Sequence, residues 1–171
     1  MPPITALLHT KNDALRLGRC LETLYPCDHI LIVDHASSDA TVHVAREYGA
    51  DVVAATEFSP EQYFRSAAPG WILSLDPRES LTESLAASFF ELKADLKIEL
   101  KSERSSDRID PYLARAFSVF LREETAGGWL DVSAPQTRLV PHTWNRWNGI
   151  FPIHDPSAFT LEGELLRFNF P

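Results

Sequence analysis

The stretch Ile30–Thr41 constrains the fold of this chain more than any other. It begins with four aliphatic residues, Ile-Leu-Ile-Val, and such an unbroken run predicts a strand buried on both faces of a parallel sheet. Asp34 follows at its carboxyl end, and Ser38 or Asp39 is expected to cap a helix that ends at Gly49. The expected apolar side of that helix is Thr41, Val44, Ala45 and Tyr48. A strand, an acid and a capped helix are typical of half a nucleotide-binding βαβ unit, in which ligands bind at the carboxyl ends of the strands.

Size and composition restrict the classes of protein that fit. A chain of 171 residues with 44% hydrophobic content predicts a single domain, residues 1–171, with a core of its own. The formal net charge of -8, without a cluster of Lys and Arg, argues against nucleic acid or an anionic membrane as partner. No apolar run reaches the roughly 20 residues that cross a bilayer, so the sequence predicts a cytoplasmic protein without a transmembrane segment. Cys20 and Cys27 lack metal-ligand spacing and are expected to be reduced thiols.

Strands and helices are expected to alternate through the first half of the chain. Besides the strand before Asp34, predicted strands cover Ile4–Leu8, Asp51–Ala54 and Trp71–Leu75, and predicted helices begin after Asn12 or Asp13, after Ser59 and, with a capping box, at Ser80–Glu83. The turn after the first strand contains no glycine, which argues against a dinucleotide-dependent oxidoreductase and a P-loop. Asp76 ends the fourth strand as Asp34 ends the second, so both acids are expected at one edge of the sheet.

The pattern changes beyond Asp95. Leu96, Ile98 and Leu100 alternate with charged residues, which predicts a half-exposed antiparallel strand. The remaining expectations are a charged loop over 102–110, a strand from about Ala116, a turn at Gly127 and Gly128, and strands over 136–140 and 161–170, the last interrupted at Gly163.

Three motifs occur in order in the first half: Thr10–Asp13, Ile32–Thr41 and Trp71–Glu79. In these the chain resembles family 2 glycosyltransferases, closest to the bacterial branch that adds sugars to lipopolysaccharide cores and similar glycans. Weaker similarity continues in Gln136–Val140 and Ile153–Asp155. The resemblance implies a three-layer α/β/α, Rossmann-like nucleotide-diphospho-sugar transferase fold, with a mostly parallel sheet and antiparallel C-terminal strands. It also implies a nucleotide-binding half, 1–95, and an acceptor-side half, 96–171.

The resemblance further implies transfer of a sugar from a nucleotide-sugar donor, with UDP as the expected nucleotide, to a glycan or lipid-linked acceptor. The residues that it assigns to the nucleotide are Thr10, Asn12, Asp34, Ser38 and Asp76. An ionised carboxylate suits this role because it accepts hydrogen bonds from two donors at once. Taken alone, Asp34 fits equally well as a strand-end acid that caps the next helix. The sequence identifies neither the acceptor nor the number of subunits.

The chain departs from the family at the metal motif. The family places Asp-x-Asp at the end of its fourth strand to hold a divalent ion, whereas this chain has Asp76-Pro77-Arg78-Glu79. A guanidinium at position 78 repels Mg²⁺ or Mn²⁺, for which Asp76 and His154 are the candidate ligands. Arg78 could replace the metal by binding the diphosphate in a metal-independent transferase. Alternatively, Asp76 and Arg78 form a salt bridge in a catalytically degenerate binding or assembly protein.

An inverting transfer also needs a base that deprotonates the acceptor hydroxyl. The family places an acid shortly before its Q-x-R-L strand, but Val132–Pro135 contains none. The candidate catalytic residues are therefore Asp131 and Asp155, then Glu79, with Arg78 as the cation. Three aromatic side chains could stack on a sugar, although burial explains them as well: Trp144, Trp147 and Phe151.

Overall fold

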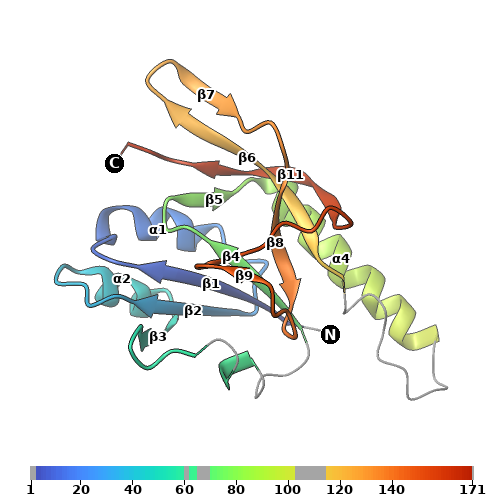
Figure 1. Ribbon diagram of the computed structural model, residues 1–171, viewed down its shortest axis with the longest axis horizontal. Coiled ribbons are helices and arrows are strands. Elements are labelled where there is room, and N and C mark those ends of the chain that lie inside the picture. Colours follow the sequence, from blue (N-terminus) through green and yellow to red (C-terminus); the bar gives the residue numbers. More distant parts are fainter. Residues whose placement is uncertain (1–2, 60–61, 65–69, 103–114, 171) are drawn as a thin grey trace.

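One nine-stranded sheet runs through the protein and carries its helices (Figure 1). The computed structural model describes residues 3–59, 62–64, 70–102 and 115–170. Within these ranges the strand order across the sheet is β3-β2-β1-β4-β8-β6-β11-β5, β7 pairs with β6, and β9 pairs with β10 in a separate hairpin. The elements are β1 (Ile4–Thr10), α1 (Ala14–Glu22), β2 (His29–Asp34), α2 (Thr41–Glu47), β3 (Asp51–Ala54), β4 (Trp71–Leu75), β5 (Glu79–Leu81), α4 (Glu83–Ser102), β6 (Phe117–Thr125), β7 (Gly128–Asp131), β8 (Gln136–Pro141), β9 (Trp147–Asn148), β10 (Phe151–Pro152) and β11 (Phe159–Arg167).

Strands β3, β2, β1 and β4 form a parallel group at one side of the sheet. The aliphatic residues of β2 are largely buried, as their unbroken run predicts. Thr10 of β1 pairs with Asp34 of β2, and Leu8 of β1 pairs with Leu75 of β4, so β1 lies between the two strands that lead to acids. Parallel strands finish at one edge, and the prediction that Asp34 and Asp76 lie along a common edge is confirmed.

The second half of the chain adds antiparallel strands beside β4. Strand β8 is antiparallel to both β4 and β6, β7 folds back on β6 as a hairpin, and β5 is antiparallel to β11. Strand β11 runs parallel to β6. The predicted architecture, an α/β fold with a parallel first half and antiparallel C-terminal strands, is confirmed.

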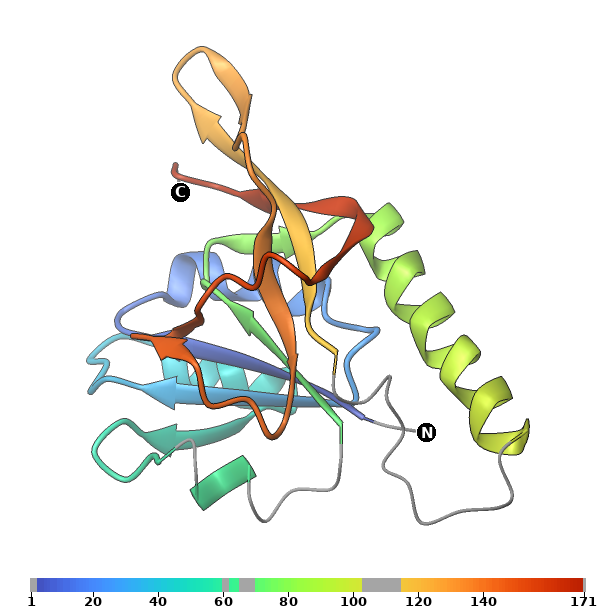
Figure 2. The same ribbon diagram turned by 45° about the vertical axis from the view of Figure 1, so that its right-hand side comes forward.

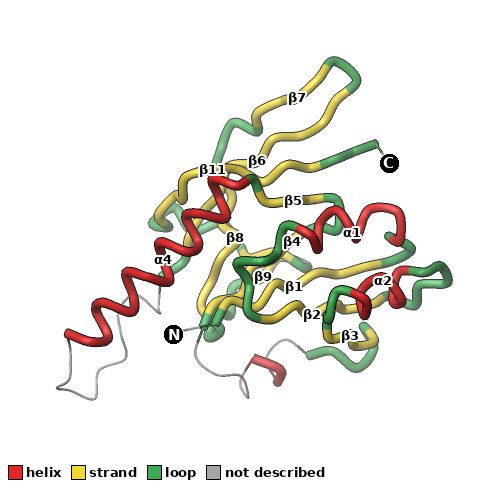
Figure 3. The backbone as a smooth tube through the Cα atoms, turned by 180° about the vertical axis from the view of Figure 1, so that it is seen from behind, coloured by secondary structure: helices red, strands yellow, loops and turns green. Residues whose placement is uncertain are grey.

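The two faces of the sheet are covered by different parts of the chain. Helices α1, α2 and α4 lie on one face (Figure 3), where Leu17, Leu85 and Phe89 pack against strand residues such as Leu73. The opposite face carries the helical residues 62–64 and the β9–β10 hairpin (Figure 2). The side chains that pack there include Leu7, Ile72 and Val140 of the sheet together with Phe64, Trp144 and Trp147. No helix in the described part of the chain is long and apolar enough to cross a membrane.

The predicted strand over Leu96 to Leu100 is wrong, because α4 continues to Ser102. The alternation of apolar and charged residues there spans only a few positions. Its Leu, Lys and Glu residues are also good helix formers. Adding a residue to an existing helix is far more favourable than nucleating a new element, so the helix that begins at Glu83 extends through this stretch.

The predicted capping box at Ser80–Glu83 is also wrong. Glu79–Leu81 forms strand β5, which pairs with the end of β11. The cap is supplied two residues later by Thr82, whose Oγ1 accepts a hydrogen bond of 3.2 Å from the backbone N–H of Leu85. The short strand is decided by β11, which is distant in sequence, and local pattern cannot reveal it.

The other helix caps differ in detail from the prediction. Asp13 and Ala40 occupy the N-cap positions of α1 and α2, and neither side chain caps its own helix. Asp39 instead accepts hydrogen bonds from the backbone N–H groups of Thr41 (2.9 Å) and Ala14 (3.2 Å), so it joins the starts of both helices. The expected helix after Ser59 falls largely outside the described residues, as does most of the charged loop over 102–110.

The three later predicted strands, from about Ala116, over 136–140 and over 161–170, are confirmed as β6, β8 and β11. The β6–β7 turn lies at Ala126 and Gly127, within one residue of the expected position, and Gly128 is already the first residue of β7. Strand β11 is irregular between Thr160 and Glu164, where Gly163 has a φ of 88°. This agrees with the predicted interruption, because a positive φ is unfavourable for side chains with a Cβ.

Candidate functional site

The loops that follow β1 and β2 are hydrogen-bonded to each other at the carboxyl edge of the sheet. Asn12 Oδ1 accepts the backbone N–H of Ser38 (2.8 Å), and the N–H of Asn12 donates to Ser37 Oγ (2.9 Å). Asn12 and Ala36 both have a φ of 56°, a left-handed conformation that Asn tolerates better than Ala. The structure thus brings together Thr10, Asn12, Asp34 and Ser38, as the motifs predict.

The carboxylate of Asp34 accepts hydrogen bonds from both of these segments. Its Oδ1 accepts hydrogen bonds from Thr10 Oγ1 (2.9 Å) and Ser37 Oγ (2.6 Å), and Oδ2 accepts the backbone N–H of Ser37 (2.9 Å). Burial alone would raise the pKa of Asp34, but the hydrogen bonds from Ser37 and Thr10 outweigh it and lower that pKa below its ordinary value. Asp34 is therefore ionised near neutral pH, and within the described residues Oδ2 receives only one hydrogen bond.

A histidine pair beside Asp34 was not among the predicted site residues. His9 Nδ1 lies 2.9 Å from His35 Nε2, and the edge of Phe58 approaches the His9 ring with a centroid distance of 6.1 Å. Burial and then the nearby His35 lower the pKa of His9 to about 4. The pairing follows from strand register, because Val33 is opposite His9 and His35 lies two positions further on.

The turn after β4 ties Asp76 to Arg78. Asp76 Oδ1 accepts from Arg78 Nε (2.9 Å) and from the Arg78 backbone N–H (2.9 Å), while Oδ2 accepts from Nη2 (3.0 Å). Burial would raise the pKa of Asp76, but Arg78 lowers it below its usual range. Arg78 Nη1 also donates to Asn169 Oδ1 at 3.3 Å. The side chain at position 78 thus occupies both carboxylate oxygens of Asp76 in a forked pair.

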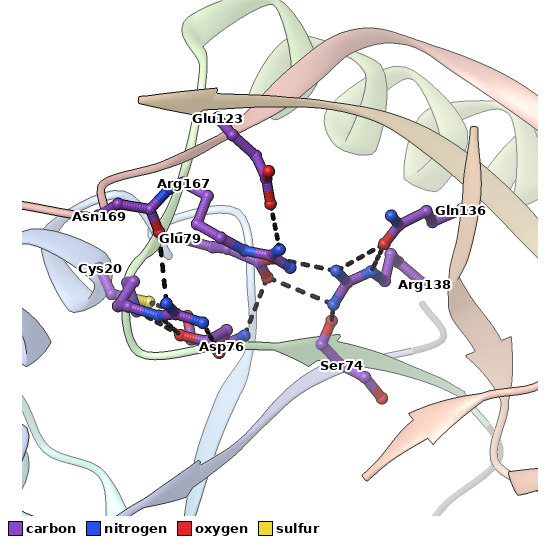
Figure 4. A network of polar contacts seen from close by, with 10 residues as sticks. Cys20, Ser74, Asp76, Glu79, Glu123, Gln136, Arg138, Arg167 and Asn169 are labelled. Carbon is purple, nitrogen blue, oxygen red and sulfur yellow. Dashed lines mark hydrogen bonds and ion pairs between the residues drawn. The ribbon is translucent and has the colours of Figure 1, made fainter. Parts of the chain in front are cut away.

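Glu79 is fully buried at the centre of a charged network (Figure 4). Its Oε2 accepts the backbone N–H of Asp76 (2.9 Å), which fixes the turn. Its Oε1 pairs with Arg138 Nη2 (2.9 Å) and Arg167 Nη2 (2.7 Å). Arg167 Nη1 continues to Glu123 Oε1 at 2.5 Å. With these partners Glu79 serves as a structural anchor and is poorly suited to act as a base.

The two arginines of this network are functional candidates that the sequence analysis missed. Arg138 was visible as the arginine of the Gln136–Val140 motif, but only the tertiary structure aims it at Glu79. Arg167 belongs to β11, and its approach to Glu79 follows from the pairing of β11 with β5. No local motif marks it.

The donor set at this edge does not fit a divalent cation. Both oxygens of Asp76 face a guanidinium, whose charge opposes a metal ion. His154 Nδ1 is instead 3.2 Å from Thr137 Oγ1. Across the described ranges, 3–59, 62–64, 70–102 and 115–170, no three His, Cys, Asp or Glu side chains are grouped as a metal would require.

The two predicted bases lie near different strands, Asp131 at the end of β7 and Asp155 in the loop between β10 and β11. The side chain of Asp131 is 79% exposed on the β6–β7 hairpin and pairs with Arg122 Nε at 2.7 Å. Asp155 donates its backbone N–H to Thr137 Oγ1 (2.9 Å) on β8, the strand next to β4. Hydrogen bonds from Ser157, and then Arg146, lower the pKa of Asp155. Topology therefore places Asp155 closer to the β4 edge, since β8 and β6 separate β7 from β4.

The three aromatic candidates are used in packing. Trp144 and Trp147 pack against the sheet face opposite the helices, and their indole N–H groups donate to backbone carbonyls of Arg146 (2.6 Å) and Trp144 (3.1 Å). The ring of Phe151 lies 4.1 Å from the guanidinium carbon of Arg138. Phe151 therefore stacks on an arginine in this structure.

Sequence comparison relates the chain to glycosyltransferases. No protein-family model matches it. Over 90 residues the chain is 29% identical to a protein of Rickettsia prowazekii named an uncharacterized glycosyltransferase, and over 90 residues it is 31% identical to a Rickettsia felis protein of the same description. The matches cover 50% of this chain but 31% and 32% of those proteins, so the chain spans about a third of the length of the curated relatives it matches. The resemblance that the motifs indicate is confirmed at the level of sequence.

Several solved structures share a more distant likeness. A structure of S. aureus TarS in complex with UDP-GlcNAc is 16% identical, with a TM-score of 0.48 over 80% of this chain and 37% of that one. Mannosyl-3-phosphoglycerate synthase of Rubrobacter xylanophilus is 19% identical, with a TM-score of 0.47 over 73% and 42%. Glucosyl-3-phosphoglycerate synthase of Mycobacterium tuberculosis, in complex with Mn²⁺, UDP and glucosyl-3-phosphoglycerate, is 16% identical, with a TM-score of 0.44 over 71% and 44%. Likenesses of this size do not bear on the ligands of this chain.

Proposed function

We propose, from its sequence relation to glycosyltransferases, that this chain is the donor-binding part of an enzyme that transfers a sugar from a nucleotide sugar. The observation that supports this most is the common edge at which Asp34 and the Asp76–Arg78 turn follow the two strands that flank β1. Ligands of open parallel sheets bind at such an edge. The acceptor is a hydroxyl compound, for which a glycan or a lipid-linked sugar is the expectation from the motifs.

In this proposal the paired loops after β1 and β2 bind the nucleoside. Thr10 donates to the Asp34 carboxylate, Asn12 and Ser38 join the two loops, and Asp34 Oδ2 can accept one more hydrogen bond, from a base N–H or a ribose hydroxyl. The backbone of both loops is held by their mutual hydrogen bonds, so little ordering is needed on binding. UDP is the proposed nucleotide.

Arg78 takes the place of a metal ion in the proposed mechanism. When the sugar leaves, negative charge develops on the diphosphate, and a guanidinium stabilises such charge with two parallel hydrogen bonds. The pair with Asp76 keeps the Arg78 side chain at the end of β4 before the donor binds. Asp155 accepts the proton of the acceptor hydroxyl as its oxygen attacks the anomeric carbon and the bond to the diphosphate breaks, which inverts the anomeric centre.

A second candidate function is a catalytically silent binding or assembly subunit of the same ancestry. Its support is that every proposed catalytic side chain already has a partner. Asp76 pairs with Arg78, Asp131 with Arg122, and Asp155 with Arg146. Acids and arginines that pair with one another are also expected in a former active site that no longer binds a ligand.

Calorimetric titration with UDP, in Mn²⁺ and again in EDTA, tests the donor site. Because Arg78 supplies the cation, we expect equal affinity in both buffers. Replacing one charged hydrogen-bonding partner costs roughly 1.5–3 kcal/mol, so Arg78→Gln is expected to weaken UDP binding roughly 10- to 100-fold. Arg46→Gln, on the exposed side of α2, is the matched control and should bind as the parent does.

The outcomes separate the candidates. Absence of UDP binding in both buffers overturns the donor site, and loss of binding in EDTA alone overturns the role of Arg78. Arg78→Asp restores the family's two acids, and an intact pocket should then bind UDP more tightly with Mn²⁺. Slow cleavage of a UDP-sugar to UDP, detected by chromatography, indicates an enzyme. Binding of the UDP-sugar without any cleavage supports the silent subunit.

A further inference from the structure

A cavity lies close to the buried Glu79, because two of its lining residues, Arg138 and Arg167, pair with that carboxylate. It has a volume of about 380 Å³, within the usual range of small-molecule sites. The start of β8, the short strand β10 and the end of β11 surround it. The side chains that matter for its chemistry are Gln136, Arg138, Phe151, His154 and Arg167.

The lining of this cavity is unusual for so acidic a chain. The protein has 24 acidic and 16 basic residues, yet the described residues that line the cavity include two arginines and a histidine and no Asp or Glu. The acids that balance the two arginines, Glu79 and Glu123, are not part of the lining. Figure 4 shows Arg138 and Arg167 side by side, each directed at Glu79.

The hydrogen-bond inventory identifies which guanidinium can take a ligand. Arg138 has no spare donor, because its five N–H groups reach Ser74 O, Glu79 and Gln136. Arg167 uses three of its five, two to Glu79 and one to Glu123. Among the described residues the other two N–H groups, one on each terminal nitrogen, have no acceptor. Each of these N–H groups can donate a charge-assisted hydrogen bond to an oxygen of a phosphate or carboxylate.

We propose that this cavity binds an oxyanion, a phosphate or carboxylate group, held by the free terminal N–H groups of Arg167 with His154 at the rim. The interpretation of this ligand rests on the proposed function, because the oxyanion would then belong to one of the two substrates of the transfer. Either an acidic group on the acceptor or the diphosphate of the donor supplies the oxyanion. Glu79 and Glu123 hold Arg167 in place before the ligand arrives, which reduces the ordering cost of binding.

Inorganic phosphate is the probe, titrated at constant ionic strength against chloride while backbone amide shifts are followed by NMR. Saturating shifts are expected at the amides of residues 132–134, 136–138, 151, 153, 154 and 167, since Pro135 and Pro152 have no N–H. Ala134 is an exposed residue of the lining, and its methyl group has no part in the hydrogen-bonded network, so it can be changed without disturbing that network. Ala134→Asp places a negative charge in the cavity and should weaken phosphate binding about tenfold or more. Ala134→Asn introduces an uncharged side chain of the same shape as Asp, so it is the control and should retain phosphate binding.

Arg167→Lys tests the donor directly, because it keeps the positive charge and loses the fork. It is expected to weaken phosphate binding about tenfold while its far-UV circular dichroism matches the parent. Shifts that fail to saturate, that map to residues 10–13 and 35–40, or that are equal in the Asp and Asn variants at position 134 would overturn the proposal.

UDP as a second ligand distinguishes the two sources and separates this inference from the proposed function. Competition between UDP and phosphate assigns the cavity to the donor diphosphate, and simultaneous binding assigns it to the acceptor. Phosphate binding in a protein that does not bind UDP upholds the cavity and removes the donor site. UDP binding without phosphate binding in the cavity upholds the donor site and removes this inference.

Discussion

Position 78 decides what kind of partner Asp76 takes. A carboxylate there would leave Asp76 and its neighbour as two oxygen-donating acids, the type of ligand that Mg²⁺ and Mn²⁺ accept. Arg78 instead provides a cation that is covalently part of the chain and lies 2.9 Å from Asp76 Oδ1. The consequence for the proposed site is a positive charge that does not depend on the metal concentration.

Glu79 is the residue on which the geometry of this edge depends most. Glu79→Gln leaves the buried Arg138 and the partly buried Arg167 with an uncharged partner, so we expect the free energy of unfolding to fall by about 3 kcal/mol. Urea denaturation followed by tryptophan fluorescence measures this. Glu123→Gln is the control, because that acid also pairs with Arg167 but is 30% exposed, and its cost should stay below about 1 kcal/mol. Equal costs would show that burial of the pair is unimportant.

At the scale of elements, the glycine in the irregular part of β11 allows the backbone of α4 to pack closely against the strand. Its irregular stretch contains Gly163, and a Cβ built there would lie 2.2 Å from the backbone N of Leu85 in the first turn of the helix. Glu164 on the same stretch supplies a carbonyl that accepts from Thr82, the cap of α4. The start of the helix and the bulge in the strand therefore require each other.

Gly163→Ala tests this dependence. The substitution combines an unfavourable positive φ with a backbone clash, and we expect it to lower the free energy of unfolding by about 3 kcal/mol. Gly49→Ala shares the positive φ, at 74°, but nothing lies within 4 Å of the added Cβ. It should cost about 1 kcal/mol. Thermal and urea denaturation of both variants measure the difference, and similar losses would argue against the close contact of β11 with α4.

At the scale of the whole molecule, stability depends on pH in two separate windows. The pKa of His9 is about 4 in the folded protein against an ordinary value of 6.5, so between those pH values the unfolded chain binds a proton that the folded chain does not. Stability therefore falls as the pH drops from 6.5 toward 4. The lowered pKa values of Asp34 and Asp76 act below their ordinary value of 3.8, where protonation removes their hydrogen-bonded, charged forms.

Substitution of His9 tests whether this residue causes the loss of stability between pH 6.5 and 4. His9→Gln removes the titrating group, so its free energy of unfolding should decline less between pH 6.5 and 4 than that of the parent, while both decline in parallel below pH 3.8. Urea denaturation at half-unit pH steps measures the slopes. Leu15→Gln, at an exposed position of α1 that carries no titrating group, is the control and should keep the parental slope. An unchanged slope in the His9 variant would contradict the assignment.

The parallel half of the fold and the grouping of Thr10, Asn12, Asp34, Ser38 and Asp76 along one edge could be predicted from the sequence. Their elements are short, strongly patterned and joined by local connections, so nearby residues contain the necessary information. The strand expected at Leu96–Leu100 was wrong because a three-residue alternation is a weak signal beside an established helix. The short strand β5 was missed because its partner, β11, lies more than 75 positions away in the chain.

By itself the sequence determined the order of strands and helices around Asp34, the shared edge of Asp34 and Asp76, and the similarity to glycosyltransferases. It left open the partner of Arg78, and it did not reveal the roles of Glu79, Arg138 and Arg167. The tertiary structure decided these, because β8 and β11 must pack beside β4 before their arginines can meet Glu79. Charged side chains that are far apart in sequence leave no local period, and their pairing is set by the burial that brings the strands together.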